Sequence, residues 1–154
     1  MSIAPIVKSV RVKAPPERAF ELFTGSMHKW WGKGVGERPF VAIVIEPRVG
    51  GRWYERDDQG NETQWGAVTL WSPPGRVLLA WQLNTRWKFD PDFSTELEIR
   101  FEAAPGGGTV VTLEHRQLER YGDEAQRHSD ALRGGWPGKM ESFAAFTDSE
   151  TGDV

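Results

Sequence analysis

Residues 121–147 carry apolar side chains at the spacing of an amphipathic helix. The apolar positions recur mainly in steps of three and four, with His128 and Ser129 in the same stripe: Ala125, Leu132, Trp136, Met140, Phe143 and Ala144. Such steps place side chains on one helical face, and most of the charged residues between them fall outside it. The pattern predicts one long helix whose apolar face has to be covered by the rest of the chain.

Seven segments before this helix have the length and the composition of strands. They are rich in Val, Ile, Trp and Phe and are separated by Gly, Pro and polar residues: residues 6–12, 40–46, 52–56, 62–71, 76–83, 95–102 and 109–115. After the first, Pro15 and Pro16 start a short helix that ends near Gly25, and residues 27–31 form a further turn. The order predicts an α+β fold, in which an antiparallel curved sheet of about seven strands wraps around the C-terminal helix and two short helices follow the first strand.

Glycine and proline interrupt these patterns at two places. Gly134, Gly135 and Pro137 lie inside the predicted helix, where glycine costs roughly 1 kcal/mol relative to alanine and proline removes a backbone hydrogen bond. The apolar stripe stays in phase across them, so we expect either a kink or two helices that meet at residues 134–137. Gly66 lies inside a strand, where it indicates a bulge or a close approach of another backbone and leaves the facing of Trp65 open.

Length and charge place few further constraints on function. The chain has 154 residues, which predicts a single domain over residues 1–147 and a flexible tail over residues 148–154. The net charge is -3 and the basic residues are scattered, so neither nucleic acid nor a membrane surface is expected as a partner.

The apolar runs are of strand length and the first residues lack a signal pattern, so the expected location is cytoplasmic. Cysteine is absent, which excludes disulfides and thiolate chemistry.

The aromatic content is unusual, with eight Trp and eight Phe against two Tyr. Indole rings are large and their N–H groups need partners. This number of them indicates either the walls of a pocket or a core packed with tryptophan, and the sequence leaves both interpretations open.

Several motifs, in order over nearly the whole chain, resemble one protein family. They are APPERAF at residues 14–20, WWG at 30–32, PRVGGRW at 47–53, WSPPGRV at 71–77, GTVVTLEH at 108–115 and GGW at 134–136. The sequence resembles the START-related, Bet v 1-like (SRPBCC) superfamily and, within it, bacterial proteins similar to the C-terminal domain of the activator of the Hsp90 ATPase. The resemblance implies a helix-grip fold with a mostly apolar cavity between sheet and helix, but no particular reaction.

Strand parity nominates the residues that would bind a ligand in such a cavity. Trp30 and Trp31 are expected at its mouth, because two adjacent indoles cannot both point into one core from a short helix. The wall is formed by inward-facing residues of the sheet and the helix: Trp53, Trp81, Leu97, Ile99, Val111, Leu113, His115, Trp136, Met140 and Phe143. For the tryptophans, plain packing is the alternative interpretation.

Two polar residues on the inner face are weak catalytic candidates. His115 shares its parity with Val111 and Leu113 and could bind a ligand oxygen or move a proton near neutral pH, although a structural histidine with satisfied hydrogen bonds is more common. Glu55 shares the face of Trp53 and could act as an acid or base if buried, or be a solvated carboxylate. No histidines have metal-ligand spacing and no glycine motif continues as a nucleotide site, so neither a metal nor a cofactor is expected.

Three functions are compatible with these features. The first is a protein that binds a hydrophobic or aromatic small molecule inside the grip and catalyses nothing. The second is an enzyme of the cyclase or aromatase kind, as related folds support, with an inner-face acid and base. The third is a chaperone-linked interaction module that uses the outer face of the sheet at Glu96, Glu98 or Arg100. Both a monomer and a homodimer fit, because exposed edge strands allow pairing.

Overall fold

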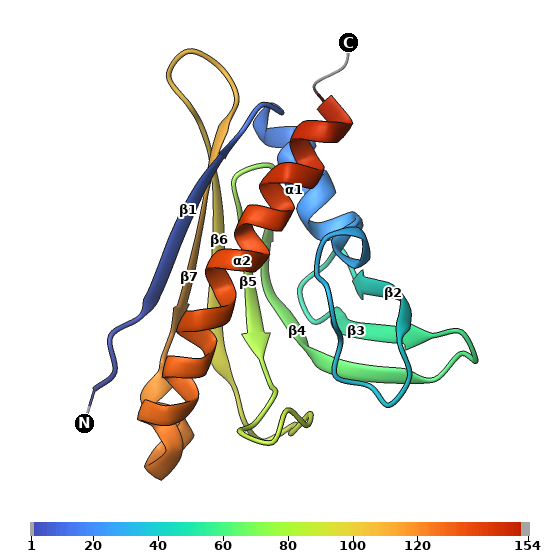
Figure 1. The fold of residues 1–154 in the computed structure, drawn as a ribbon, viewed down its shortest axis with the longest axis vertical. Coiled ribbons are helices and arrows are strands. Elements are labelled where there is room, and N and C mark those ends of the chain that lie inside the picture. Colours follow the sequence, from blue (N-terminus) through green and yellow to red (C-terminus); the bar gives the residue numbers. More distant parts are fainter. Residues whose placement is uncertain (1, 152–154) are drawn as a thin grey trace.

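A computed structural model describes residues 2–151, which form one curved sheet and one long C-terminal helix (Figure 1). Neighbouring strands are antiparallel, in the order β1-β7-β6-β5-β4-β3-β2. The elements are β1 (Ile6–Val12), α1 (Pro16–Gly25), the 3-10 turn η1 (Met27–Lys29), β2 (Phe40–Ile45), β3 (Arg52–Asp57), β4 (Glu62–Ser72), β5 (Arg76–Trp81), β6 (Thr95–Ala103), β7 (Thr109–Arg116), the 3-10 segment η2 (Leu118–Glu124) and α2 (Ala125–Thr151). The predicted α+β helix-grip fold is confirmed.

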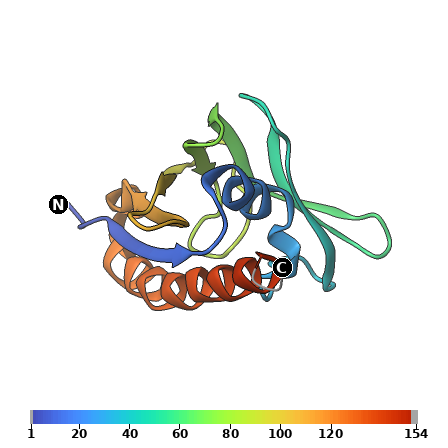
Figure 2. The ribbon, with the colours of Figure 1, turned by 90° about the horizontal axis from the view of Figure 1, so that it is seen from above.

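The apolar face of α2 is buried against the inner face of the sheet. Seen from above, the helix runs along the open side of the curved sheet, next to β1 (Figure 2). Its buried residues follow the predicted spacing: Ala125, His128, Ser129, Leu132, Trp136, Met140, Phe143 and Thr147. The sheet contributes Leu79, Leu97, Ile99, Val111 and Leu113, all at most 1% exposed. Burial of this apolar area holds the helix on the sheet.

Helix α2 is continuous, and Pro137 lies inside it. The alternative of two separate helices that meet at residues 134–137 is therefore wrong. Trp136 and Met140, on either side of the proline, are only 2% and 0% exposed, so their packing offsets the lost backbone hydrogen bond. The helix includes residues 148–151 of the expected tail, and residues 152–154 lie outside the described part of the chain. No helix within residues 2–151 is long and apolar enough to span a lipid bilayer.

Strand β4 contains a bulge at Trp65. Trp53 pairs with Gly66 whereas the next residue, Tyr54, pairs with Gln64, so Trp65 is the extra residue. A Cβ atom at Gly66 would lie 1.8 Å from the carbonyl oxygen of the facing Ala80. The bulge and the close approach expected at Gly66 are both confirmed, and the bulge turns the indole of Trp65, which is 1% exposed, toward the interior.

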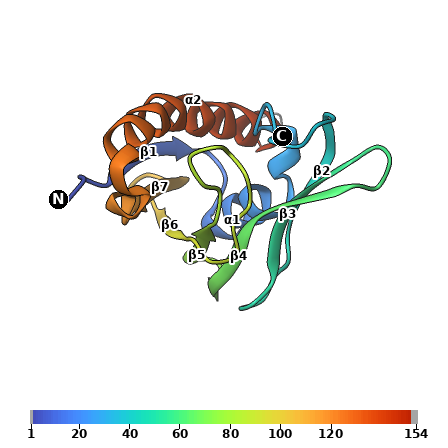
Figure 3. The same ribbon diagram turned by 90° about the horizontal axis from the view of Figure 1, so that it is seen from below.

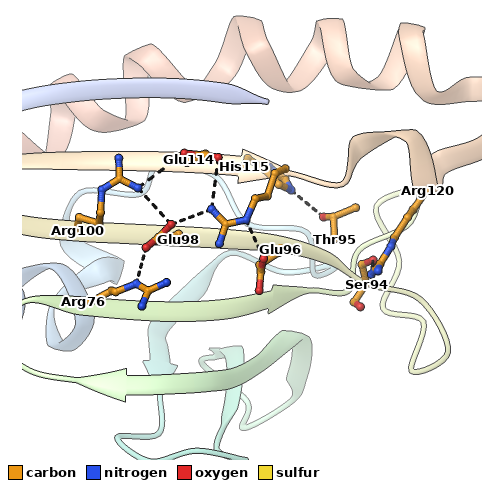
Figure 4. Close-up of polar contacts among 10 residues, drawn as sticks. Arg76, Ser94, Thr95, Glu96, Glu98, Arg100, Glu114, His115 and Arg120 are labelled. Atoms are coloured by element: carbon orange, nitrogen blue, oxygen red, sulfur yellow. Dashed lines mark hydrogen bonds and ion pairs between the residues drawn. The ribbon is translucent and has the colours of Figure 1, made fainter. Parts of the chain in front are cut away.

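The outer face of the sheet carries a cluster of ion pairs across β5, β6 and β7 (Figure 4). Glu98 lies at its centre and accepts hydrogen bonds from Arg76, Arg100 and Arg116. The Glu98 side chain is 7% exposed. The alternation of apolar and polar residues in β6 predicts that this face is exposed to solvent, but at Glu98 it is covered by arginine side chains.

Candidate ligand-binding site

Five tryptophans form a closed ring inside the grip. Each contacts the next, with ring centroids 5.0 Å (Trp31–Trp65), 5.3 Å (Trp65–Trp53), 5.7 Å (Trp53–Trp81), 5.6 Å (Trp81–Trp136) and 5.6 Å (Trp136–Trp31) apart. They come from the segment after η1 and from β3, β4, β5 and α2, and each is at most 6% exposed. Aromatic pairs of this kind contribute about 0.5–1.5 kcal/mol each beyond their burial, so the ring ties α2 to the sheet.

A pocket of about 500 Å³ adjoins this ring. Four of the ring tryptophans line it, and Trp87 completes the aromatic wall: Trp31, Trp65, Trp81 and Trp136. The other lining residues come from α2 and from the loops before β2 and before β6: Lys33, Gly34, Val35, Leu83, Arg86, Lys88, Ala131, Leu132, Gly135 and Lys139. Both loops lie at the lower end of the molecule in Figure 1, which faces the viewer in Figure 3. The volume falls within the roughly 300–1,000 Å³ usual for small-molecule sites.

Glu55 holds the first of these loops in place. Its Oε1 accepts hydrogen bonds from the backbone N–H of Val35 (2.7 Å) and from the indole N–H of Trp65 (2.9 Å). A Cβ atom at Gly34 would lie 2.6 Å from both carboxylate oxygens, so glycine is needed for the loop to approach this closely. Glu55 is 2% exposed and does not line the pocket. It positions the loop and one wall of the pocket.

The second loop presents Trp87 at the mouth. The side chain of Asn84 accepts hydrogen bonds from the backbone N–H groups of Arg86 (2.9 Å) and Lys88 (3.1 Å). Between them, Trp87 has a φ of 60°, a left-handed conformation that is unusual for a bulky residue. Its ring is 41% exposed and packs on His128, with the ring centroids 5.0 Å apart. The loop thus holds an exposed indole at the mouth of the pocket.

His115 lies behind the pocket and orients Trp136. Its Nδ1 accepts the indole N–H of Trp136 (3.1 Å), and its Nε2 lies 2.7 Å from the hydroxyl oxygen of Thr95 (Figure 4). Because Nδ1 accepts, the neutral ring carries its proton on Nε2 and donates it to Thr95. Burial lowers the pKa of His115 to about 3. The imidazole is therefore neutral at pH 7, and both of its nitrogens are occupied by protein groups.

Lys139 is the half-buried cation of the pocket. Its Nζ lies 4.1 Å from the centre of the Trp31 ring and donates a hydrogen bond to the Trp31 carbonyl oxygen (3.1 Å). Burial lowers the pKa of Lys139 to about 8. The amine is thus mostly charged at pH 7 and becomes neutral at a pH far below the usual value for lysine.

The structure brings together three of the twelve nominated ligand-binding residues at the pocket: Trp31, Trp81 and Trp136. The other nine are buried in the packed core and do not line it: Trp30, Trp53, Leu97, Ile99, Val111, Leu113, His115, Met140 and Phe143. Trp30 and Trp31 are both buried, contrary to the argument that adjacent indoles cannot share one core. Trp30 caps the 3-10 turn with a non-helical backbone (φ -131°, ψ -7°), so the two indoles leave the chain in different directions. Trp30 packs on Phe143 while Trp31 packs on Trp65.

Parity did not identify the cationic and loop residues of the pocket. Lys33, Arg86, Trp87 and Lys88 lie in loops, where no alternation exists, and Lys139 lies at the border of the apolar helix stripe. One local signal was present in the sequence, namely a tryptophan between two basic residues at positions 86–88. Among residues 2–151, no group of three or more histidines and carboxylates is close enough to hold a metal ion.

The curved antiparallel sheet that grips a C-terminal helix defines a START-related helix-grip protein, a class whose fold supports a ligand-binding or cyclase-like role. Residues 13–150 match the family described as activator of Hsp90 ATPase homolog 1-like protein. The chain belongs to this family, as its motifs predicted.

Solved structures extend the comparison. The chain is 37% identical to an anthrahydroquino-γ-pyrone synthase, Txn09, complexed with SUM, over 94% of this chain and 97% of that chain, with a TM-score of 0.67. It is 31% identical to CalC from Micromonospora echinospora, described as a self-sacrificing resistance protein, over 97% of each chain, with a TM-score of 0.72. The Aha1 dimer from Colwellia psychrerythraea shares the fold at 18% identity over 97% of this chain and 100% of that chain, with a TM-score of 0.67. No curated protein sequence gave a match.

Proposed function

We propose that this protein binds a planar, polycyclic aromatic small molecule in the tryptophan-lined pocket. The observation that carries the proposal is the wall of five indoles around about 500 Å³: Trp31, Trp65, Trp81, Trp87 and Trp136. Flat aromatic ligands make offset and edge-on contacts with such rings, and burial of their apolar surface drives binding.

The names of the relatives favour a small molecule over a chaperone. The synthase at 37% identity is named for an anthrahydroquino-γ-pyrone, a compound with fused aromatic rings. A chaperone-linked role draws its support from the family name and from a relative at 18% identity. On the outer face of the sheet, moreover, Glu98 and Arg100 are already engaged with each other.

The test uses 2-(hydroxymethyl)anthraquinone as a neutral probe and its quenching of tryptophan fluorescence as the readout. Gly135 lines the pocket, and a Cβ atom there would meet no atom within 4 Å. Gly135→Leu should therefore place its side chain in the pocket and weaken binding by about tenfold or more, since it removes space the ligand needs.

Gly134→Leu is the matched control. Gly134 also has open space at its Cβ position but does not line the pocket, so this variant should bind the probe like the wild type. Absence of saturable quenching in the wild type, or equal weakening in both variants, would contradict the proposal.

A cyclase-like activity is the second candidate, favoured by the Lys139 amine. With a pKa of about 8, this group can donate or accept a proton near neutral pH. The test offers the substrate of the anthrahydroquino-γ-pyrone synthase to this protein and follows conversion by chromatography. A Lys139→Met variant should bind that compound and fail to convert it. Binding by the wild type without any conversion would leave a carrier role and reject the enzyme.

A further inference from the structure

We infer that the pocket takes its aromatic ligand as an anion and that the Lys139 ammonium group contacts the ligand's acidic oxygen. The inference rests on the proposed function and names the class of ligand, namely polycyclic aromatics that carry a carboxylate or an ionised phenol.

The charges that line the pocket are all positive. Lys33, Arg86, Lys88 and Lys139 contribute to its surface, and no Asp or Glu does. The whole chain has a net charge of -3, so the excess of cations is local to this site. A concave site lined by one sign of charge concentrates ligands of the opposite sign.

In the part of the chain that the structure describes, these four cations have no carboxylate partner, in contrast to the arginines on the outer face of the sheet. On the outer face of the sheet, Arg76, Arg100 and Arg116 are all paired with glutamates. Within residues 2–151, none of the four pocket cations lies within salt-bridge distance of a carboxylate. Their charge is therefore available to a bound molecule.

Lys139 is the one best placed to contact the ligand directly. Lys33, Arg86 and Lys88 are exposed at the mouth of the pocket. Lys139, in contrast, is half-buried against Trp31. Charge interactions strengthen where water is excluded, and those at an exposed mouth are screened by salt.

The Lys139 ammonium group can also donate further hydrogen bonds. It has three donors, and the Trp31 carbonyl uses one of them. A ring system packed on the tryptophan wall can thus present an acidic oxygen to the remaining donors.

The experiment compares two probes of nearly equal shape, anthraquinone-2-carboxylate and neutral 2-(hydroxymethyl)anthraquinone, by calorimetry at pH 7. The wild type should bind the carboxylate at least about tenfold more tightly, because a charge-assisted hydrogen bond is roughly twice as strong as a neutral one. In Lys139→Met, which keeps the aliphatic stem, the ratio of the two affinities should fall to about one or two. Lys13→Met, an exposed lysine outside the pocket, should keep the wild-type ratio.

The outcomes separate the two proposals. Binding of both probes with equal affinity, or a preference for the carboxylate that persists in Lys139→Met, would overturn this inference and leave the proposed aromatic site intact. Failure of the wild type to bind either probe would instead overturn the proposed function. Saturable binding of the neutral probe to Lys139→Met confirms that the variant has a folded pocket.

Discussion

Glycine has opposite roles at two positions of this chain. Gly66 faces the carbonyl oxygen of Ala80, which would lie 1.8 Å from any Cβ atom, whereas Gly134 lies in α2 with nothing within 4 Å of that position. The first glycine is required by the close approach of two backbones. The second only adds flexibility to a helix, where alanine is favoured by roughly 0.5–1 kcal/mol.

The same substitution should therefore have opposite effects at the two positions. Gly66→Ala should lower the free energy of unfolding by about 3 kcal/mol, the upper part of the range for overpacking. Gly134→Ala should raise it by about 0.5–1 kcal/mol, the usual gain in a helix. Urea denaturation followed by circular dichroism measures both, and a loss of stability in Gly134→Ala would show that the helix needs flexibility at this residue.

At the scale of elements, the alternation in β6 correctly predicted which side chains face inward but not what covers the outward ones. Arginines from β5 and β7, together with Arg100 of β6 itself, surround Glu98. Burial by itself raises the pKa of Glu98, but hydrogen bonds from Arg116 and Arg76 outweigh it and hold the pKa below its usual range. The carboxylate therefore links three strands.

Removal of this charge should destabilise the sheet. Glu98→Gln should lower the free energy of unfolding at pH 7 by about 1–3 kcal/mol, because three guanidinium groups lose a charged acceptor while remaining partly solvated. Glu21→Gln is the control, because it removes an exposed ion pair with Arg18 on α1. It should change the free energy of unfolding by less than about 0.5 kcal/mol. Equal effects of the two substitutions in urea denaturation would show that the cluster contributes no more than a surface pair.

At the scale of the whole molecule, one buried histidine joins three elements. His115 of β7 contacts Thr95 of β6 and Trp136 of α2. Its pKa is about 3 in the folded protein against about 6.5 in an unfolded chain. Between these values the unfolded chain binds a proton that the folded protein does not, so stability decreases as the pH falls from about 6.5 toward 3.

The pH dependence of unfolding checks this linkage. As the pH is lowered from about 6 to about 4, the free energy of unfolding of the wild type should decrease more steeply than that of His115→Asn. The difference between the two slopes should be up to about 1.4 kcal/mol per pH unit. Asparagine can still accept the indole N–H of Trp136 but does not titrate. Burial also lowers the pKa of His128, but His128 is present in both proteins and cancels in the comparison. Parallel slopes for the two proteins would contradict a folded pKa near 3.

The sequence by itself determined the elements, their order and the face of α2 that is buried, because strand and helix periodicities are local and are written into neighbouring residues. The positions of the turns followed for the same reason, and so did the motifs that identified the family. Gly66 even marked the bulge that turns Trp65 inward.

Only the tertiary structure decided which tryptophans are packed in the core and which line the pocket. Trp53 of β3 and Trp81 of β5 flank Gly66 of β4 and are both buried, yet only Trp81 lines the pocket. The gathering of four cations at the pocket depends on how two loops and α2 meet in space, across more than a hundred residues from Lys33 to Lys139. Periodicity contains no information about such contacts, because they arise from the curvature and closure of the sheet around the helix.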